Sequence, residues 1–130
     1  MTNVNAIAKI VAAAHCNDSV SLIGWIFPGG AKIVGRLGLS LTRVDQNGKR
    51  EVLTTKLPFE GEDNADWKSQ PSTVWPIQRM FHMDFTAKVG NTYTYEVQAM
   101  GGTPGNLVAI PGMLAVTNPV NVSTKVDDTF

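Results

Sequence analysis

The sequence predicts an all-β fold, an antiparallel β-sandwich of about seven short strands in one domain. Val, Ile and Thr, which favour strands, number 14, 7 and 12 in a chain of 130 residues. The 12 glycines and 7 prolines interrupt them at short intervals, as the turns between strands do. Apolar residues at helical spacing are nearly absent. These observations together predict strands and turns along the chain.

The first half of the chain contains four expected strands. Residues 4–15 alternate as an edge strand would, although their alanine content and apolar spacing also fit a helix. Residues 19–27 form an apolar run, which predicts a strand buried on both faces. Leucines alternate with small or polar residues over 36–44, which predicts a half-buried strand. The turn Asp-Gln-Asn-Gly at 45–48 then predicts a hairpin with 51–57 as its returning strand, because Asn and Gly tolerate positive φ.

The second half begins with a long polar loop, residues 58–76, and loops of this length are usually functional or mobile. Residues 92–100 are the clearest strand, because tyrosine, valine and alanine alternate strictly with polar residues. Two further strands are expected, one at 77–85 and a last one made of 107–110 and then 114–123, with a break at Asn118-Pro119 where the chain can change sheets. We expect one domain over 1–130, with its core at about 19–123 and a polar tail at 124–130.

Charge and cysteine content argue against several classes of protein. The 11 basic and 11 acidic residues give a formal net charge of zero, so a basic nucleic-acid-binding surface is not expected. The single cysteine, Cys16, cannot form an internal disulfide. The longest apolar run, 22–27, is too short for a membrane span. No convincing signal peptide is recognised, because no Lys or Arg precedes the alanine-rich segment 4–14, and a cytoplasmic location is favoured.

The sequence holds no recognisable catalytic or cofactor motif. His15, Cys16 and His82 lack the spacing of metal ligands. Residues 30–37 have two glycines at phosphate-loop spacing, but Arg and Leu follow where Lys and then Ser or Thr are needed. His82 and Asp84 would share one face of a strand, yet no nucleophile accompanies them, so a solvated face is their expected setting. We predict a protein that is not an enzyme and that uses no cofactor.

The candidate binding residues lie in the 58–76 loop. Trp67 and Trp75 would suit an aromatic platform for a sugar ring or for a partner's hydrophobic side chain. The alternative is that both indoles fold back over one end of the sandwich and plug its core. Three acids of this loop bring together the hard oxygen ligands that calcium prefers: Glu62, Asp63 and Asp66. Their spacing does not match an EF-hand, so a solvated acidic loop is the simpler interpretation.

The run Tyr-Thr-Tyr-Glu-Val-Gln-Ala at 93–99, after the turn Val-Gly-Asn, resembles the E–F corner and F strand of fibronectin type III and related immunoglobulin-like domains. The resemblance covers about residues 19–122. It implies that Trp25 is a core tryptophan of strand B and that 37–44 is strand C. It also implies that Tyr93 and Tyr95 are structural, with the Tyr93 hydroxyl bonded to the backbone across the E–F turn. It carries no catalytic residue.

A narrower resemblance rests on Arg-Leu-Gly-Leu-Ser-Leu at 36–41, Pro-Ile-Gln-Arg-Met-Phe-His-Met-Asp at 76–84, and Tyr-Thr-Tyr at 93–95. These stretches resemble the amino-terminal immunoglobulin-like region of some bacterial phospholipase D-like proteins. In that family, two His-x-Lys-x-x-x-x-Asp motifs further along carry the phosphodiesterase chemistry. Neither His15 nor His82 is followed by Lys two residues later, so the resemblance implies the non-catalytic front module alone.

Two functions are expected from these observations. The first is a non-catalytic accessory or interaction module, a monomer or weak oligomer that serves a protein partner or an adjacent catalytic domain. The alternative is a carbohydrate- or other ligand-binding module that uses Trp67 and Trp75, with calcium held by the acids of the same loop.

Overall fold

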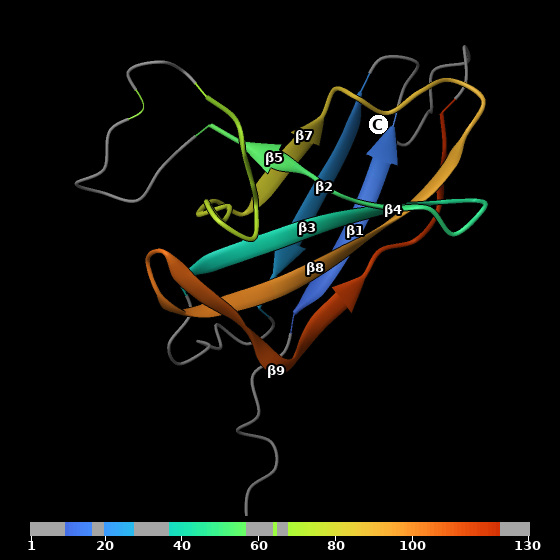
Figure 1. Cartoon of the computed structure of the whole chain (residues 1–130). Helices are drawn as coiled ribbons and strands as arrows, with labels where there is room; N and C mark the ends of the chain where they lie inside the picture. The colour runs from blue at the N-terminus through green and yellow to red at the C-terminus, as the bar shows by residue number, and fades with distance from the viewer. Residues whose placement is uncertain (1–9, 17–19, 28–36, 57–63, 65–67, 123–130) are drawn as a thin grey trace, which may run out of the picture.

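The computed structural model describes residues 10–16, 20–27, 37–56, 64 and 68–122. Within these residues the chain forms strands and turns without a helix, and every strand pairing is antiparallel. The predicted all-β class is therefore confirmed. Figure 1 shows two main layers of strands with a short two-stranded sheet beside them. In this part of the chain, no helix is present that is long and apolar enough to cross a membrane.

One layer is a three-stranded sheet, here called sheet A, with the strand order β1-β2-β7. Its strands are β1 (Val11–Cys16), β2 (Ser21–Ile26) and β7 (Phe81–Asp84). β1 pairs with β2 along its whole length, so the strand interpretation of 4–15 is confirmed over the described residues. Ser21, Ile23 and Trp25 are buried while their neighbours along β2 are more exposed, because alternate side chains of a strand point to opposite faces.

The other layer, sheet B, is built around β3 and β8, which pair over eight residues. β4 flanks β3 on one side, and both β9 and β10 pair with β8 on the other. The strands of this sheet are β3 (Gly38–Asp45), β4 (Arg50–Val52), β8 (Thr92–Thr103), β9 (Asn106–Val116) and β10 (Val120–Asn121). The remaining sheet pairs β5 (Thr54–Thr55) with β6 (Gln70–Pro71).

Several expected boundaries differ in the structure. The described residues form ten strands rather than about seven, partly because the expected strand at 51–57 is divided into β4 and β5. The expected strand at 77–85 is also divided: Ile77 bridges Leu39 of sheet B, whereas β7 begins at Phe81 and pairs with β2. The chain therefore crosses from one layer to the other between Ile77 and Phe81.

The expected change of sheet at Asn118-Pro119 is wrong. β9 ends at Val116 opposite Glu96, and β10 resumes with Val120 opposite Tyr93, so both segments stay beside β8. Proline has no N–H to donate to a ladder, which explains an interruption here but does not require the chain to leave the sheet.

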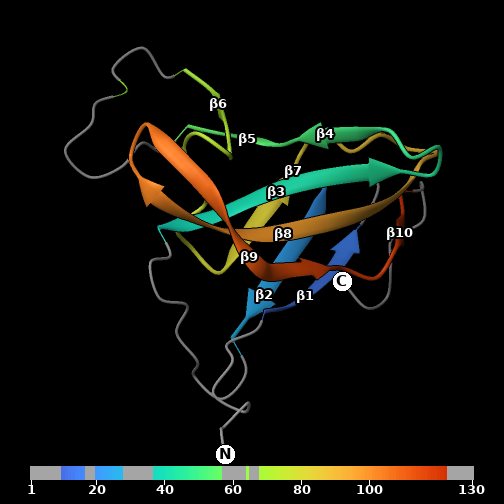
Figure 2. The same cartoon turned by 60° about the horizontal axis from the view of Figure 1, so that its bottom comes forward.

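The inner faces of the two sheets share one hydrophobic core. Ile23 and Trp25 of sheet A pack in the same buried cluster as Leu41, Tyr95 and Val97 of sheet B. Figure 2 shows the two layers from a second direction, with sheet A crossing behind β3 and β8. Two antiparallel layers over one core are compatible with a β-sandwich.

Candidate functional site

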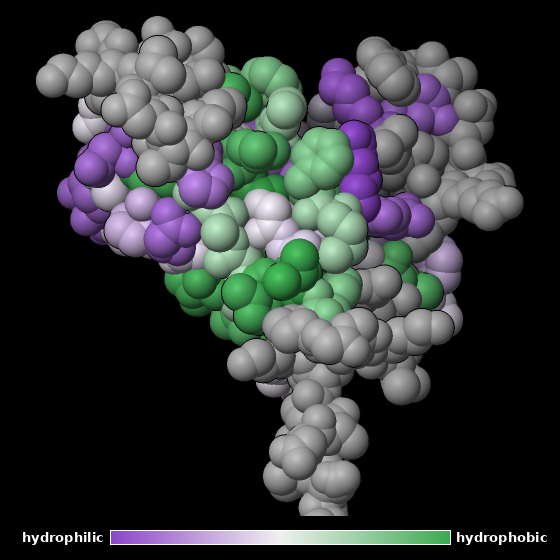
Figure 3. Space-filling view, turned by 180° about the vertical axis from the view of Figure 1, so that it is seen from behind, coloured by the Kyte–Doolittle hydropathy of each residue, from purple (hydrophilic) through white to green (hydrophobic). Residues whose placement is uncertain are grey.

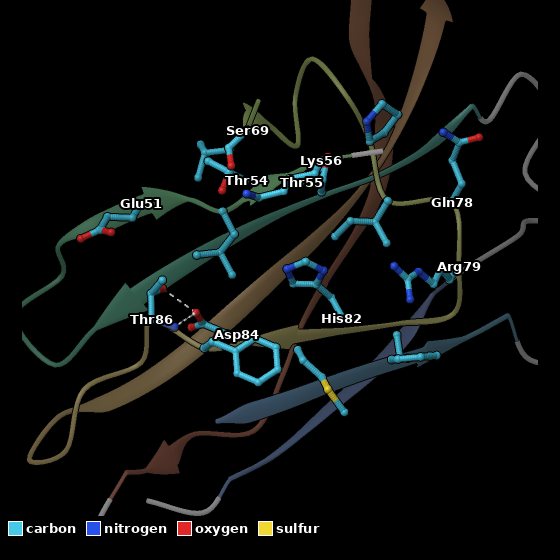
Figure 4. Close-up of a pocket in the computed structure, with 17 residues that line it drawn as sticks. Glu51, Thr54, Thr55, Lys56, Ser69, Gln78, Arg79, His82, Asp84 and Thr86 are labelled. Carbon is cyan, nitrogen blue, oxygen red and sulfur yellow. Dashed lines mark hydrogen bonds between the residues drawn. The ribbon is translucent and has the colours of Figure 1, made fainter. Parts of the chain in front are cut away.

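A cavity of about 890 Å³ opens between the β4–β5 segment and β7. Val52, Thr54 and Lys56 line one side, and Arg79 and His82 line the other. Figure 4 shows His82 pointing from β7 into this space, toward the β4–β5 side. The cavity therefore lies between one edge of sheet A and the neighbouring edge of sheet B.

The cavity exists because the two sheets end at different places. Sheet A ends at β7, whereas sheet B continues past β3 to β4 on the same side. Within the described residues, no strand pairs with the outer edge of β7. The space that a further strand of sheet A would fill is thus open.

His82 is half-buried in the wall of the cavity. Burial lowers its pKa, because a partly desolvated imidazole disfavours its charged form, and the charge of Arg79 lowers it further. The carboxylate of Asp84 acts in the opposite direction but does not reverse the shift. His82 is therefore mainly neutral at neutral pH.

Asp84 is buried, which contradicts the solvated face expected for it. Its Oδ2 accepts hydrogen bonds from Arg43 Nη1 at 2.9 Å and from the Tyr95 hydroxyl at 2.8 Å. Its Oδ1 accepts from the Thr86 hydroxyl at 2.6 Å and from Thr86 N at 3.0 Å. Burial alone would raise the pKa of Asp84, but the bonds from Thr86, Tyr95 and Arg43, with the Arg43 charge, hold it below its usual value.

Arg43 completes this network from sheet B. Its Nη1 also donates to Thr86 Oγ1 at 2.7 Å, and its Nη2 donates to Glu51 Oε2 at 2.9 Å. The guanidinium carbon lies 4.8 Å from the centre of the Tyr93 ring. Burial alone would lower the pKa of Arg43, but the bond to Asp84 and the nearby carboxylates raise it above its usual value. The network is a satisfied structural clamp between the sheets, and it occupies both oxygens of Asp84.

One sequence signal pointed to this clamp and was missed. Arg43 has the same strand parity as Leu39 and Leu41, so a cation sits on the core-facing side of β3. A buried cation requires a buried anion. The identity of that anion could not be read from the sequence, because Asp84 lies 41 residues further along the chain.

The structural residues implied by the resemblance lie in the core. Trp25 is buried, and its Nε1 has no hydrogen-bond partner among the described residues. Tyr93 is also buried, and its hydroxyl accepts hydrogen bonds from Lys88 N at 3.1 Å and from the Asn91 side chain at 3.0 Å. The Lys88 bond spans the turn that precedes β8.

Of the expected ligand site in the 58–76 loop, Trp75 is the one residue within the described part of the chain. Of the two tryptophans, Trp75 is half-buried and is not among the residues that line the cavity, while its carbonyl accepts a bond from Thr55 Oγ1 at 2.7 Å. The other proposed ligands lie outside the described residues: Trp67, Glu62, Asp63 and Asp66. In the described parts of the chain, no three His, Cys, Asp or Glu side chains are grouped to hold a metal ion.

The outer face of sheet A carries exposed apolar side chains. In the register of the sheet, Val11 lies opposite Ile26, Gly24 opposite Phe81, and Leu22 opposite Met83. The exposed members of this face are Val11, Ile26, Phe81 and Met83, with Phe85 just after the end of β7. Figure 3 shows apolar residues gathered over the centre of the face seen from behind. We call this surface the apolar face of sheet A.

No protein-family model matches this chain, and no curated protein matches it significantly.

Proposed function

We propose that this protein is a non-catalytic immunoglobulin-like module that binds a protein partner or an adjacent catalytic domain. The apolar face of sheet A is the observation that carries the proposal. Phe81 and Met83 are each more than two-fifths exposed, and Phe85 is 71% exposed. Contiguous apolar surface on a folded domain is typical of an interaction site.

The strand order supports the immunoglobulin-like part of the proposal. β1, β2 and β7 have the positions of strands A, B and E, and β3, β8 and β9 have those of C, F and G. The bond from Lys88 N to the Tyr93 hydroxyl supports the comparison with the tyrosine corner of fibronectin type III domains.

The Asp84 network supports the non-catalytic part. A general acid or base must be free to exchange a proton with a substrate. Asp84 accepts four hydrogen bonds, so the adjacent His82 has no free carboxylate beside it to act as its partner.

The association with phospholipase D-like enzymes is the narrower form of this proposal. Segments 76–84 and 93–95, which carry that resemblance, meet in the hydrogen bond from the Tyr95 hydroxyl to Asp84. Shared residues at this position are therefore explained by a structural role, as expected for a front module.

The proposal is tested by photocrosslinking in the native host. Benzoylphenylalanine at Met83 should crosslink a protein, and that protein, once purified, should bind the wild-type chain directly. The double variant Phe81→Ser/Met83→Ser should weaken this binding by more than about tenfold. The matched control Leu114→Ser, at an exposed position of β9, should leave it unchanged.

Two results would overturn the proposal. One is equal binding of the purified partner to the wild type and the double variant. The other is hydrolysis of a phosphodiester substrate that His82→Ala abolishes, because a module without catalysis has no turnover to lose.

A further inference from the structure

Among the described residues, no strand pairs with the outer edge of β7, which presents a defined set of backbone groups. Trp25 N donates to Met80 O at 3.1 Å, in the register that also pairs Ile23 with His82. Because hydrogen-bonding direction alternates along an antiparallel strand, His82 faces β2 and its neighbours Phe81 and Met83 face outward. Each therefore presents an N–H and a C=O at the free edge.

The opposite edge of sheet A, the outer edge of β1, is hydrogen-bonded at Ala14. Asn118 Oδ1 accepts a hydrogen bond from Ala14 N at 3.0 Å, and Asn118 Nδ2 donates to Ala14 O at 2.9 Å. Among the described residues, no such bond engages the outward backbone groups of Phe81 and Met83. An open edge of this kind is a template for a further strand.

The cavity beside this edge has room for an added strand. A strand beside β7 would lie about 4.8 Å from it, in the 890 Å³ space bounded on its far side by β4 and β5. Its alternate side chains would point inward toward Leu53 and Ile77, and the others would extend the apolar face of sheet A.

The charges of the cavity favour an acidic occupant. Among the described residues, the two carboxylates that line it, those of Glu51 and Asp84, are bound to Arg43. Arg79 lies at the start of β7, stacked 5.5 Å from the centre of the Phe81 ring, and has no carboxylate partner among the described residues. Carboxylates on the inward side of an added strand would face the Arg79 guanidinium, which lines the cavity.

We propose that the free edge of β7 binds an extended acidic segment of a partner protein by strand addition, with carboxylates directed into the cavity and apolar side chains directed outward. This inference rests on the proposed function and adds to it the binding mode and the chemistry of the partner.

The test uses the probe peptide acetyl-Thr-Val-Glu-Val-Glu-Val-Thr-amide and the wild-type chain, followed by calorimetry and by amide NMR shifts. The peptide should bind and shift the amides of Phe81 and Met83. The same peptide with lysine in place of glutamate should bind at least about tenfold more weakly.

Backbone pairing is tested with N-methylated peptides. One peptide is methylated on its three valine amides and another on its two glutamate amides. Only one of these sets can face β7, so one peptide should lose at least about tenfold in affinity while the other changes by less than about threefold. Equal affinities for the two methylated peptides would overturn strand addition without any change to the protein.

The matched protein variants are Met83→Pro and Met83→Ala. Proline removes the outward N–H but no bond to β2, so the variant should fold and lose at least about tenfold in peptide affinity. Alanine removes the same side chain but keeps the N–H, so Met83→Ala should bind the peptide at least about tenfold more tightly than Met83→Pro. Unaltered binding by a folded Met83→Pro would overturn the proposal.

Other results separate this inference from the proposed function. Failure of the peptide to bind, while the crosslinked partner still needs Phe81 and Met83, would refute strand addition and leave the interaction module standing. Self-association of the wild type that Met83→Pro abolishes would assign the edge to a second copy of the chain and also overturn the inference.

Discussion

Arg43 of β3 and Asp84 of β7 form a buried ion pair that joins the two sheets, with Nη1 and Oδ2 2.9 Å apart and side chains 7% and 2% exposed. The pair lies beside the outer edge of β7, with which no further strand of the described residues pairs. It therefore fixes the position of β7 relative to sheet B. The geometry of the cavity therefore depends in part on this pair and on the Tyr95–Asp84 hydrogen bond beside it.

Removal of one member of this pair should destabilise the protein strongly. Asp84→Ala leaves the Arg43 charge buried with only Glu51 as its partner, and should lower the free energy of unfolding by about 3–5 kcal/mol. The double variant Arg43→Met/Asp84→Leu removes both charges and should recover much of that loss. Urea unfolding measures the free energy of unfolding of the wild type, the single variant and the double variant. A double variant as unstable as Asp84→Ala would show that the hydrogen bonds, rather than the unpaired charge, dominate.

The same carboxylate should give the protein a specific acid sensitivity. The pKa of Asp84 is lower in the folded state than its unfolded value of about 3.9. Its stabilisation is therefore fully present above that value and disappears as the pH falls through the folded pKa. Urea unfolding between pH 7 and pH 2 should show a steeper loss below about pH 4 for the wild type than for Asp84→Asn. Parallel curves for the two proteins would contradict the assignment.

His82 should make the stability of the protein depend on pH in a higher range than Asp84 does. Its folded pKa lies below the unfolded value of about 6.5, so the folded state resists protonation and stability falls as the pH drops below that value. His82→Gln should remove this fall between about pH 7 and pH 5. NMR titration of the imidazole measures the folded pKa directly, and a value above that of a free histidine would refute the prediction.

Alanine substitution should affect stability differently at Gly38 and at Gly24. A Cβ at Gly38 would lie 2.7 Å from Pro76 Cβ and 3.0 Å from the Ile77 carbonyl oxygen, so Gly38→Ala should cost about 1–3 kcal/mol. A Cβ at Gly24 would meet nothing closer than Met80 O at 4.0 Å. Gly24→Ala should therefore be neutral or slightly stabilising, because alanine restricts the unfolded chain. Thermal unfolding of both variants measures the contrast.

Hydrogen exchange should distinguish the two edges of sheet A. The Ala14 amide is bonded to Asn118 and should exchange slowly, whereas the outward Met83 amide should exchange fast. Asn118→Ala should speed exchange at Ala14 and leave Met83 unchanged. Slow exchange at Met83 in the wild type would mean that its N–H is not at a free edge.

The all-β class and the approximate positions of the longer strands were predictable from the amino-acid sequence. Strand period and turn chemistry are local properties, so the alternation of tyrosine, valine and alanine over 93–99 and the Asn47-Gly48 turn were sufficient for β8 and for the β3–β4 hairpin. The parity of Arg43 with Leu39 and Leu41 was also present in the sequence, but its meaning was missed.

The contacts between groups far apart in the sequence depend on how the strands pair and the layers pack. Asp84 became the partner of Arg43, and Ile77 and Phe81 joined different sheets, because strand pairing brings together residues far apart in sequence. The cavity and the open edge of β7 follow from the widths of two facing sheets. No local pattern encodes that difference, because it arises when the layers pack on each other.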